Sequence, residues 1–455
     1  MTRLRPELLR PRGIAVLGAS GDPERLGHRP LKYLAATGFA GAVYPVNPRR
    51  ERIGDLRCYP DLASVPDPVD LALISLAADQ VPGALNACAA RGVGMAVILS
   101  ADLPPDLRPP EGLLVMGPNS MGFLDAHAPV AATWNSTLDL GTVRAGSVGL
   151  IAQSGGLGGA VLNRLLDRGI GISQAFFSGE ERFLDTCDLL ELLLDDAATG
   201  LIVLLVEGLR RPTRFLELAR RAREREVPLI AFKLARSPRS AVAALAHTGM
   251  LAGRRRVQQA AFRQVGIVEA ETLDVVVDLA VVFAQTPAKP TPFGGRLAVF
   301  TTSGGAAILA QDVCDSLGLE LPPPSAETVE ALRPLLHPWT PIANPLDVGA
   351  GLPEGDLLRA LATLAADPRI DVVVSINTMI GGRAKLAERA RGLLDLAAEL
   401  PKPLLTCWLG GSLSEEALTI LRDAGRPHFL SVEACLGALR AAREYHRRRS
   451  LWISP

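Results

Sequence analysis

The chain has 455 residues, which is too long for one hydrophobic core, so its length predicts two to four domains. Its 48 Lys and Arg residues balance its 48 Asp and Glu residues, so no net charge attracts nucleic acid or an acidic membrane surface. Gly, Pro or charged residues interrupt every apolar run, and no apolar signal core follows Met1. We therefore expect neither a membrane span nor a signal peptide.

The six cysteines are scattered along the chain and form no Cys-x-x-Cys pair. This spacing predicts reduced thiols in a cytoplasmic protein. It predicts neither disulfides nor a zinc site or other metal site.

Strand-like and helix-like patterns alternate along the chain, which is typical of parallel sheets covered by helices. The first expected strands span residues 14–17, 43–46, 71–75 and 95–99, with helices at 30–36 and 80–90. A second set of strands follows at 148–152, 201–206, 229–233 and 266–268, and a third at 297–301, 372–376 and 404–408.

Two breaks in this alternation divide the chain. The pattern lapses around residues 125–145, and the proline-rich stretch 285–293 is typical of a semi-rigid extended linker. We therefore predict an α/β protein of three doubly wound parallel-sheet domains, at residues 1–125, 146–284 and 294–450.

Each predicted domain begins with a strand, a turn of small residues and a helix. The three turns are Gly18-Ala19-Ser20, Ser154-Gly155-Gly156 after Gln153, and Ser303-Gly304-Gly305. Such a turn presents free backbone N–H groups at a helix N-terminus, which suits phosphate. One such turn is common for packing alone, but one in each domain predicts phosphate-bearing ligands in more than one place.

The end of the second strand differs from that of a NAD-binding domain. The first turn lacks the Gly-x-Gly-x-x-Gly pattern, and Asn47-Pro48-Arg49-Arg50 stands where an acidic residue usually binds the ribose. Two arginines there favour an additional phosphate group, as carried by coenzyme A or NADP. Exposed loop charges without a ligand are an equally good interpretation.

His247 lies between two helix-like stretches, among small residues that let a ligand approach closely. An imidazole that titrates near neutral pH can act as base, metal ligand or nucleophile, and its neighbours alone leave all three open. We expect His337 to be structural. A surface position is expected for His28, His127, His428, His446 and Lys233.

In their order, these motifs resemble those of the NDP-forming acyl-CoA synthetase family, relatives of succinyl-CoA synthetase, and specifically its ADP-forming acetyl-CoA synthetase α subunits. The resemblance covers nearly the whole chain. Besides the three turns, it rests on Gly117-Pro118-Asn119-Ser120-Met121-Gly122, Val206-Glu207-Gly208, His247-Thr248-Gly249 and Asn344-Pro345-Leu346-Asp347. It implies a CoA-binding Rossmann-like domain followed by two flavodoxin-like domains, the first of which contains the phosphohistidine.

The resemblance also implies a phosphorelay. An ATP-grasp module phosphorylates His247, the phosphoryl group passes to a small carboxylic acid, and coenzyme A then takes the acyl group. Glu207 is expected to accept a hydrogen bond from the other imidazole nitrogen. The implied CoA-binding residues are Gly18, Ala19, Ser20, Asn47, Pro48 and Arg49, and the implied phosphate-binding residues are Ser154, Gly155, Gly156, Ser303, Gly304 and Gly305.

Three features depart from the family pattern. No ATP-grasp domain is visible, so ATP, ADP and Mg are expected on a separate β subunit, in a hetero-oligomer or homodimer. Gly179-Glu180-Glu181-Arg182-Phe183 replaces Gly-Asn-x-Ala-Asp, and the stretch after Ser100 lacks Gly-Phe-x-Glu and contains Pro104-Pro105. Together with the adjacent Phe176 and Phe177, Phe183 suggests an acid larger or more apolar than acetate.

Two other functions stay open. A non-catalytic CoA or acyl-CoA sensor would have kept the domains and lost the relay. An NADP-dependent oxidoreductase is disfavoured, because no catalytic Tyr/Lys pair accompanies the first domain.

Overall fold

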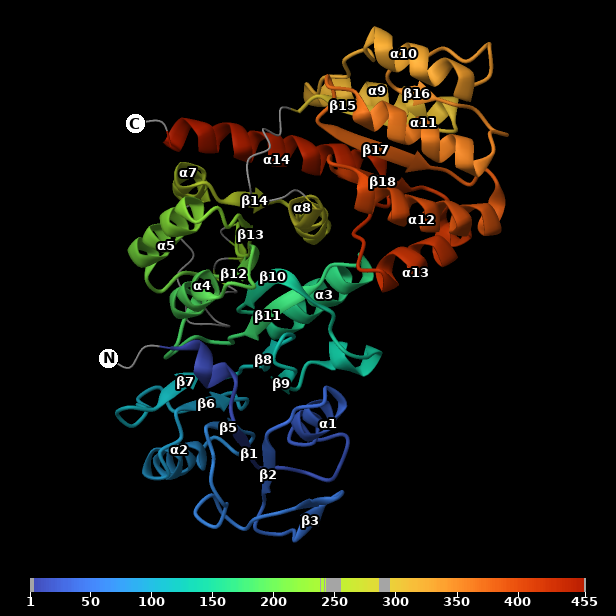
Figure 1. Cartoon of the computed structure of the whole chain (residues 1–455). Coiled ribbons are helices and arrows are strands. Elements are labelled where there is room, and N and C mark those ends of the chain that lie inside the picture. The colour runs from blue at the N-terminus through green and yellow to red at the C-terminus, as the bar shows by residue number, and fades with distance from the viewer. Residues whose placement is uncertain (1–3, 238, 241, 243–254, 286–294, 454–455) are drawn as a thin grey trace. The chain divides into compact units, whose positions relative to one another are not determined.

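The computed structural model describes residues 4–237, 239–240, 242, 255–285 and 295–453. Its contacts divide the chain into two compact units, Met1–Asn163 with Gly171–Glu269, and Arg164–Ile170 with Ala270–Pro455. Figure 1 draws the first unit from blue to green and the second mainly from yellow to red.

The first unit begins with a five-stranded parallel sheet in the order β2-β1-β5-β6-β7. Its strands are β1 (Gly13–Leu17), β2 (Ala42–Val46), β5 (Leu71–Ile74), β6 (Met95–Ile98) and β7 (Leu114–Met116). Helices α1 (Arg29–Ala36) and α2 (Val81–Ala90) cross over in opposite directions from the centre, so right-handed connections place them on opposite faces (Figure 1). The minor elements are η1 (Pro6–Leu9), β3 (Arg52–Ile53) and β4 (Leu56–Arg57).

A seven-stranded sheet follows in the order β14-β13-β12-β10-β11-β8-β9. Its central strands β10 (Ala145–Ala152), β11 (Ile172–Phe177), β12 (Leu201–Val206) and β13 (Leu229–Lys233) are parallel. Strand β14 (Val268–Ala270) forms one edge. The helices are α3 (Gly155–Asp167), α4 (Thr186–Asp195), α5 (Pro212–Glu224) and α7 (Arg255–Val265), with the 3-10 helix η2 (Ser136–Leu140).

Strands β8 (Gly122–Asp125) and β9 (Val130–Thr133) form an antiparallel hairpin on β11, so this sheet is not wholly parallel. The hairpin lies where the sequence alternation lapses. Strand β9 contacts α1, and one buried apolar cluster contains residues of both sheets. The hairpin therefore helps to join the two sheets into one unit.

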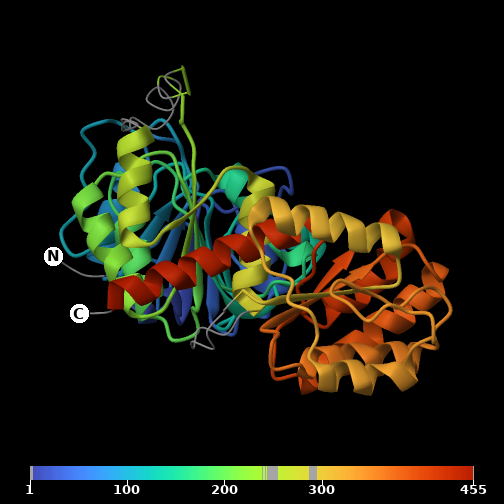
Figure 2. The same ribbon diagram turned by 90° about the horizontal axis from the view of Figure 1, so that it is seen from above.

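The second unit contains a four-stranded parallel sheet in the order β16-β15-β17-β18. Its strands are β15 (Leu297–Thr301), β16 (Leu346–Asp347), β17 (Val372–Asn377) and β18 (Leu404–Trp408). Figure 2 shows helices on both faces of this sheet. The helical elements are α8 (Leu273–Gln285), α9 (Gly304–Leu317), α10 (Ala326–Leu332), η3 (Arg333–Leu335), α11 (Glu354–Ala366), α12 (Gly382–Glu399), η4 (Gly411–Ser414), α13 (Glu415–Asp423) and α14 (Val432–Ile453).

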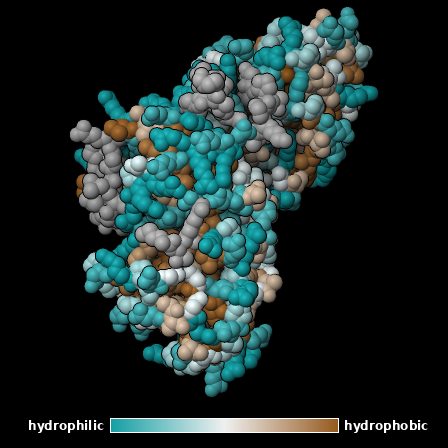
Figure 3. All heavy atoms as spheres, turned by 60° about the vertical axis from the view of Figure 1, so that its left-hand side comes forward, coloured by the Kyte–Doolittle hydropathy of each residue, from teal (hydrophilic) through white to brown (hydrophobic). Residues whose placement is uncertain are grey.

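The predicted α/β class with parallel sheets is confirmed, and the antiparallel hairpin is an addition to it. The three domain boundaries stay predictions, and most of the proposed linker at 285–293 lies outside the described residues. The surface in Figure 3 is mostly hydrophilic, and among the described residues nine large apolar side chains are exposed. No helix in this part of the chain combines the length and apolarity needed to cross a membrane.

Candidate functional site

The turn after β1 lies where the strand order reverses, with β2 on one side of β1 and β5 on the other. Gly18 has φ +81°, and a Cβ there would lie 2.1 Å from the Ser75 carbonyl oxygen, so the turn requires glycine. Asn47 Nδ2 donates to the Ala19 carbonyl at 2.9 Å, and its Oδ1 accepts from the Arg49 N–H at 2.9 Å. Asn47 therefore orders the two loops that meet at this sheet edge.

The side chains at this edge would suit a nucleotide with several phosphate groups, such as coenzyme A or NADP. Parallel α/β sheets bind nucleotides at the carboxyl ends of strands where the order reverses. Ser20 is partly exposed, and Pro48, Arg49 and Arg50 are exposed. Two guanidinium groups beside a glycine turn form a donor set suited to a ligand with several phosphates.

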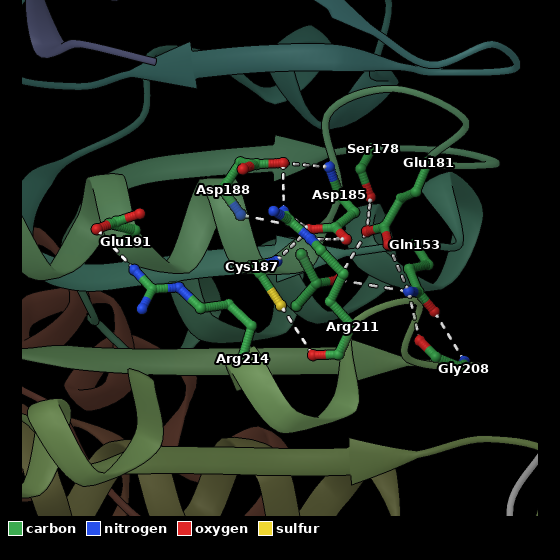
Figure 4. Close-up of polar contacts among 11 residues, drawn as sticks. Gln153, Ser178, Glu181, Asp185, Cys187, Asp188, Glu191, Gly208, Arg211 and Arg214 are labelled. Carbon is green, nitrogen blue, oxygen red and sulfur yellow. Dashed lines mark hydrogen bonds and ion pairs between the residues drawn. The ribbon is translucent and has the colours of Figure 1, made fainter. Parts of the chain in front are cut away.

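At the equivalent edge of the second sheet, the Gln153 amide connects three loops (Figure 4). Gln153 follows β10 and is buried; its Oε1 accepts from the N–H groups of Glu207 at 2.5 Å and Gly208 at 3.1 Å. Its Nε2 donates to the Gly208 carbonyl at 2.8 Å and to Glu181 Oε2 at 2.9 Å. In the sequence, Gln153 directly precedes the Ser154-Gly155-Gly156 turn, but nothing there indicated its role.

Glu181 is a buried carboxyl group that the sequence did not identify as a site residue. Its backbone has φ +53°, and its Oε1 accepts from Ser178 Oγ and Thr186 Oγ1, both at 2.7 Å (Figure 4). No ion pair reaches it among the described residues. Burial raises the pKa of Glu181, and the neutral hydrogen-bond donors offset this only in part.

Replacing Glu181 by glutamine is expected to change how stability depends on pH. In the folded state the pKa of this carboxyl is raised above its ordinary value of 4.5. Between the ordinary and the raised pKa the folded state therefore binds more protons than the unfolded state, and wild-type stability falls as pH rises. Glutamine does not titrate, so Glu181→Gln removes this slope. The contacts can be kept, because the amide oxygen can face Gln153 while its NH₂ group donates to the hydroxyls of Ser178 and Thr186. Urea unfolding at several pH values should show the variant gaining stability relative to wild type as the pH rises above 4.5. A difference that is constant with pH would refute the assignment.

Lys233 was expected in solvent, and this prediction is wrong. The side chain is 4% exposed, and Nζ donates to the Glu207 carbonyl at 2.5 Å and also to the Leu234 carbonyl. Burial lowers the pKa of Lys233 to about 8, with the Glu207 charge opposing that shift. The ammonium group thus sits at the carboxyl ends of β12 and β13, beside Glu207, which is 8% exposed.

The two remaining small-residue turns begin long helices. Gly155 and Gly156 form the first turn of α3, and a Cβ on Gly156 would meet nothing within 4 Å. Ser303 caps α9 by accepting from the Ala306 N–H, and Gly304 lies close to the Asp347 carboxylate. The first turn belongs to the unit that contains Glu207 and Lys233, and the second belongs to the other unit.

His247 lies outside the described residues, so its contact with Glu207 stays a prediction. His428, expected at the surface, is buried, and burial lowers its pKa to about 4. His337 is exposed and stacks on Trp339 with ring centroids 5.1 Å apart. No cluster of three or more His, Cys, Asp or Glu side chains arranged to hold a metal ion occurs within the described ranges.

Two of the segments that depart from the family pattern contact each other. Arg182, in the changed segment, forms an ion pair with Glu180 at 2.9 Å. It also donates to the carbonyls of Leu103 at 3.2 Å and Pro104 at 3.0 Å, in the proline-containing stretch. The arginine therefore fixes the altered loop of the first sheet to the altered loop of the second.

The aromatic residues that suggested a larger acid do not line an open site. Phe176 and Phe177 are fully buried in β11, and Phe176 stacks on Phe123 at 5.9 Å. Phe183 packs against the apolar cluster of the first sheet. These three residues therefore give no information about the size of the acid.

Two domain families match the chain, the CoA binding domain over residues 12–124 and the succinyl-CoA ligase like flavodoxin domain over residues 145–283. The alpha subunit of ADP-forming acetate–CoA ligase II from Pyrococcus furiosus is 33% identical over 92% of this chain and 93% of that subunit. ADP-forming acetate–CoA ligase I from Archaeoglobus fulgidus is 30% identical, and the match spans 97% of this chain and 63% of that protein. The solved dinucleotide-forming acetyl-coenzyme A synthetase 1 of Candidatus Korarchaeum cryptofilum, in complex with phosphate and ADP, superposes with TM-score 0.86. It is 31% identical over 98% of this chain and 97% of that chain.

A CoA-binding Rossmann-like domain followed by a succinyl-CoA-ligase-like flavodoxin domain defines a ligase of the acyl-CoA-forming class. The chain belongs to the NDP-forming acyl-CoA synthetase family and corresponds to its α-type subunit. The resemblance drawn from the sequence motifs is thereby confirmed. The alternative of a non-catalytic sensor is not favoured, because the named relatives are ligases.

Proposed function

We propose that the chain carries the phosphohistidine relay of an ADP-forming acyl-CoA synthetase in the cytoplasm, with an ATP-grasp β subunit supplying the Mg-nucleotide site. The chain spans 63% of the Archaeoglobus fulgidus relative and 93% of the Pyrococcus furiosus alpha subunit. The relatives that match over nearly their whole length are named alpha subunits, which supports a partner subunit for the nucleotide chemistry in a hetero-oligomer.

In the proposed reaction, a ring nitrogen of His247 attacks the γ-phosphorus of ATP and ADP leaves. A carboxylate oxygen of the acid then attacks the phosphorus, which restores the imidazole and forms an acyl phosphate. The CoA thiol loses its proton and attacks the acyl carbon, and inorganic phosphate leaves. The first two steps transfer a charged phosphoryl group and the third releases phosphate, so positioning and charge stabilisation supply most of the catalysis.

The roles of the site residues follow from this scheme. The first turn of α3, at Ser154-Gly155-Gly156, would bind the transferring phosphoryl group through its N–H groups. The corresponding turn of α9, at Ser303-Gly304-Gly305, is proposed for the same chemistry. The loops that Asn47 orders would hold the CoA phosphates, using Gly18, Ala19, Ser20, Pro48 and Arg49.

The resemblance does not determine which carboxylic acid is the substrate. Three relatives are named for different acyl groups: acetate in one that is 33% identical, trans-feruloyl-CoA in one that is 30% identical, and 4-hydroxybutyrate in one that is 25% identical. We therefore propose a small carboxylic acid as the substrate class.

The observation that best supports the proposal is the burial of Glu207 at the sheet edge that carries the α3 turn, where the Lys233 ammonium group donates to the Glu207 backbone carbonyl. A carboxylate there stabilises positive charge on an imidazole that becomes phosphorylated. Glu207→Gln is expected to lower kcat for acyl-CoA formation about 100-fold with little change in KM, because the charge is needed during transfer. The measurement is steady-state acyl-CoA formation with ATP, CoA, an acid and a co-expressed ATP-grasp protein.

The matched control is Glu224→Gln, an exposed carboxyl group near the end of α5. It should leave kcat unchanged. An equal effect of the two substitutions, or none of either, would contradict the role given to Glu207.

A further inference from the structure

A cavity of about 350 Å³ opens along one side of α3. Its walls include Gly155, Gly159 and Ala160 of the helix, and Met121, Asn135 and Leu140 of the segment that follows β7. Residues three or four positions apart lie on one side of a helix, as Gly155 and Gly159 do, so the cavity begins at the α3 turn and extends along it. Gly159 lies four residues after Gly155, slightly more than one helical turn, which is about 6 Å along the helix axis.

Glycine on the helix allows the opposite wall to approach closely. A Cβ at Gly155 would lie 2.2 Å from Met121 Sδ, and one at Gly159 would lie 2.8 Å from Asn135 Nδ2. Any larger residue would displace these two side chains. The helix face and the facing segment are therefore shaped to each other.

Asn135 leaves a hydrogen-bond donor without a partner at this wall. The residue is 2% exposed, and its Oδ1 accepts from the Thr137 N–H at 3.0 Å. Its Nδ2 has no acceptor among the described residues. A buried donor left unpaired destabilises the folded chain, and an acceptor on a bound molecule removes that cost.

We propose that this cavity holds the acyl chain of the acid substrate, and that the chain is larger than acetyl and carries an oxygen substituent. The proposal rests on the proposed function, which places the phosphorylated carboxyl group at the α3 turn. An acyl chain running from there along the helix reaches Asn135 after one turn, where Nδ2 donates to its oxygen. A cavity of about 150 Å³ already accommodates benzene, so this one has room for a ring-sized acyl group.

The test uses the full chain, CoA and three synthetic acyl phosphates: acetyl, benzoyl and 4-hydroxybenzoyl phosphate. The CoA thiol attacks the acyl carbon and releases phosphate, so no ATP-grasp partner is needed. We expect kcat/KM at least about 10-fold higher for 4-hydroxybenzoyl than for acetyl phosphate, since one methylene-sized contact already discriminates about 10-fold or more. Ala160→Phe fills the cavity from an exposed helix position and should lower this ratio at least 10-fold.

Asn135→Asp keeps the acceptor for Thr137 but removes the donor, so it should lower the preference for 4-hydroxybenzoyl over benzoyl phosphate. The matched control is Ala331→Phe, on an exposed position of α10 in the other unit. A preference for acetyl phosphate, or a ratio that Ala160→Phe leaves unchanged, overturns the proposal while acyl-CoA formation still supports the proposed function.

A binding measurement separates the two proposals if no acyl-CoA forms. Saturation-transfer NMR should detect 4-hydroxybenzoate on the wild-type chain and at least 10-fold weaker binding to Ala160→Phe. That result would support the cavity although the relay had failed. No binding, or equal binding to both chains, would overturn the cavity assignment.

Discussion

Replacing His247 with alanine is expected to abolish acid-labile phosphate on the chain. An imidazole nitrogen is nucleophilic at neutral pH and forms a phosphoramidate that transfers its phosphoryl group readily. Alanine leaves no nucleophile at that position, so phosphorylation should fall from near one group per chain to background. Intact-mass spectrometry and phosphorus NMR would measure it, after incubation with an acyl phosphate or with ATP and an ATP-grasp partner.

Two further variants make this result specific. His127→Ala removes an exposed imidazole that contacts the Gly146 carbonyl, and phosphorylation should stay at the wild-type level. Glu207→Gln should slow phosphorylation without abolishing it, because the nucleophile remains. Equal labelling of His247→Ala and wild type would exclude His247 as the phosphoryl carrier.

Strands buried on both faces could be predicted closely from the sequence. The apolar runs of β12 and β13 gave their bounds to the residue, because a central parallel strand must be apolar throughout. Strand β11 was missed, since it contains Ser173 and Gln174. Both are buried and paired, Ser173 with Thr199 Oγ1 at 2.7 Å and Gln174 with Asp125 Oδ2 at 3.1 Å. Such pairing depends on residues distant in sequence, so the composition of the strand does not reveal it.

The candidate site, too, could be predicted from the sequence only in part. Its glycine turns could be located because a strand, small residues and a helix follow one another in the sequence. The Gln153–Glu181 contact joins loops 28 positions apart, and the Lys233–Glu207 contact joins strand ends 26 positions apart. The one available signal was the change to Gly179-Glu180-Glu181, which introduces a carboxyl group beside a glycine. It indicated an altered pocket but not that Glu181 would be buried against Gln153.

Gln153→Leu is expected to destabilise the first unit more than any single surface change. Leucine is similar in volume, but it leaves the N–H groups of Glu207 and Gly208 without their acceptor. It also removes one of the three side-chain donors to the buried Glu181 carboxyl. Unpaired buried backbone groups cost roughly 1–3 kcal/mol each, so the loss of the acceptor for two of them should cost about 2–6 kcal/mol.

Urea unfolding followed by far-UV circular dichroism measures this loss as a lower transition midpoint with little change in slope. The matched control is Gln311→Leu on α9, where the amide makes a hydrogen bond to Asp315 near the surface. One exposed hydrogen bond contributes about 1 kcal/mol or less. If both leucine variants unfold at the same urea concentration, Gln153 is not the residue that holds these loops together. If only Gln153→Leu lowers the transition midpoint, the Gln153 amide stabilises the loops that carry Glu207 and the α3 turn. The stability of the fold and the geometry of the proposed relay then depend on the same side chain.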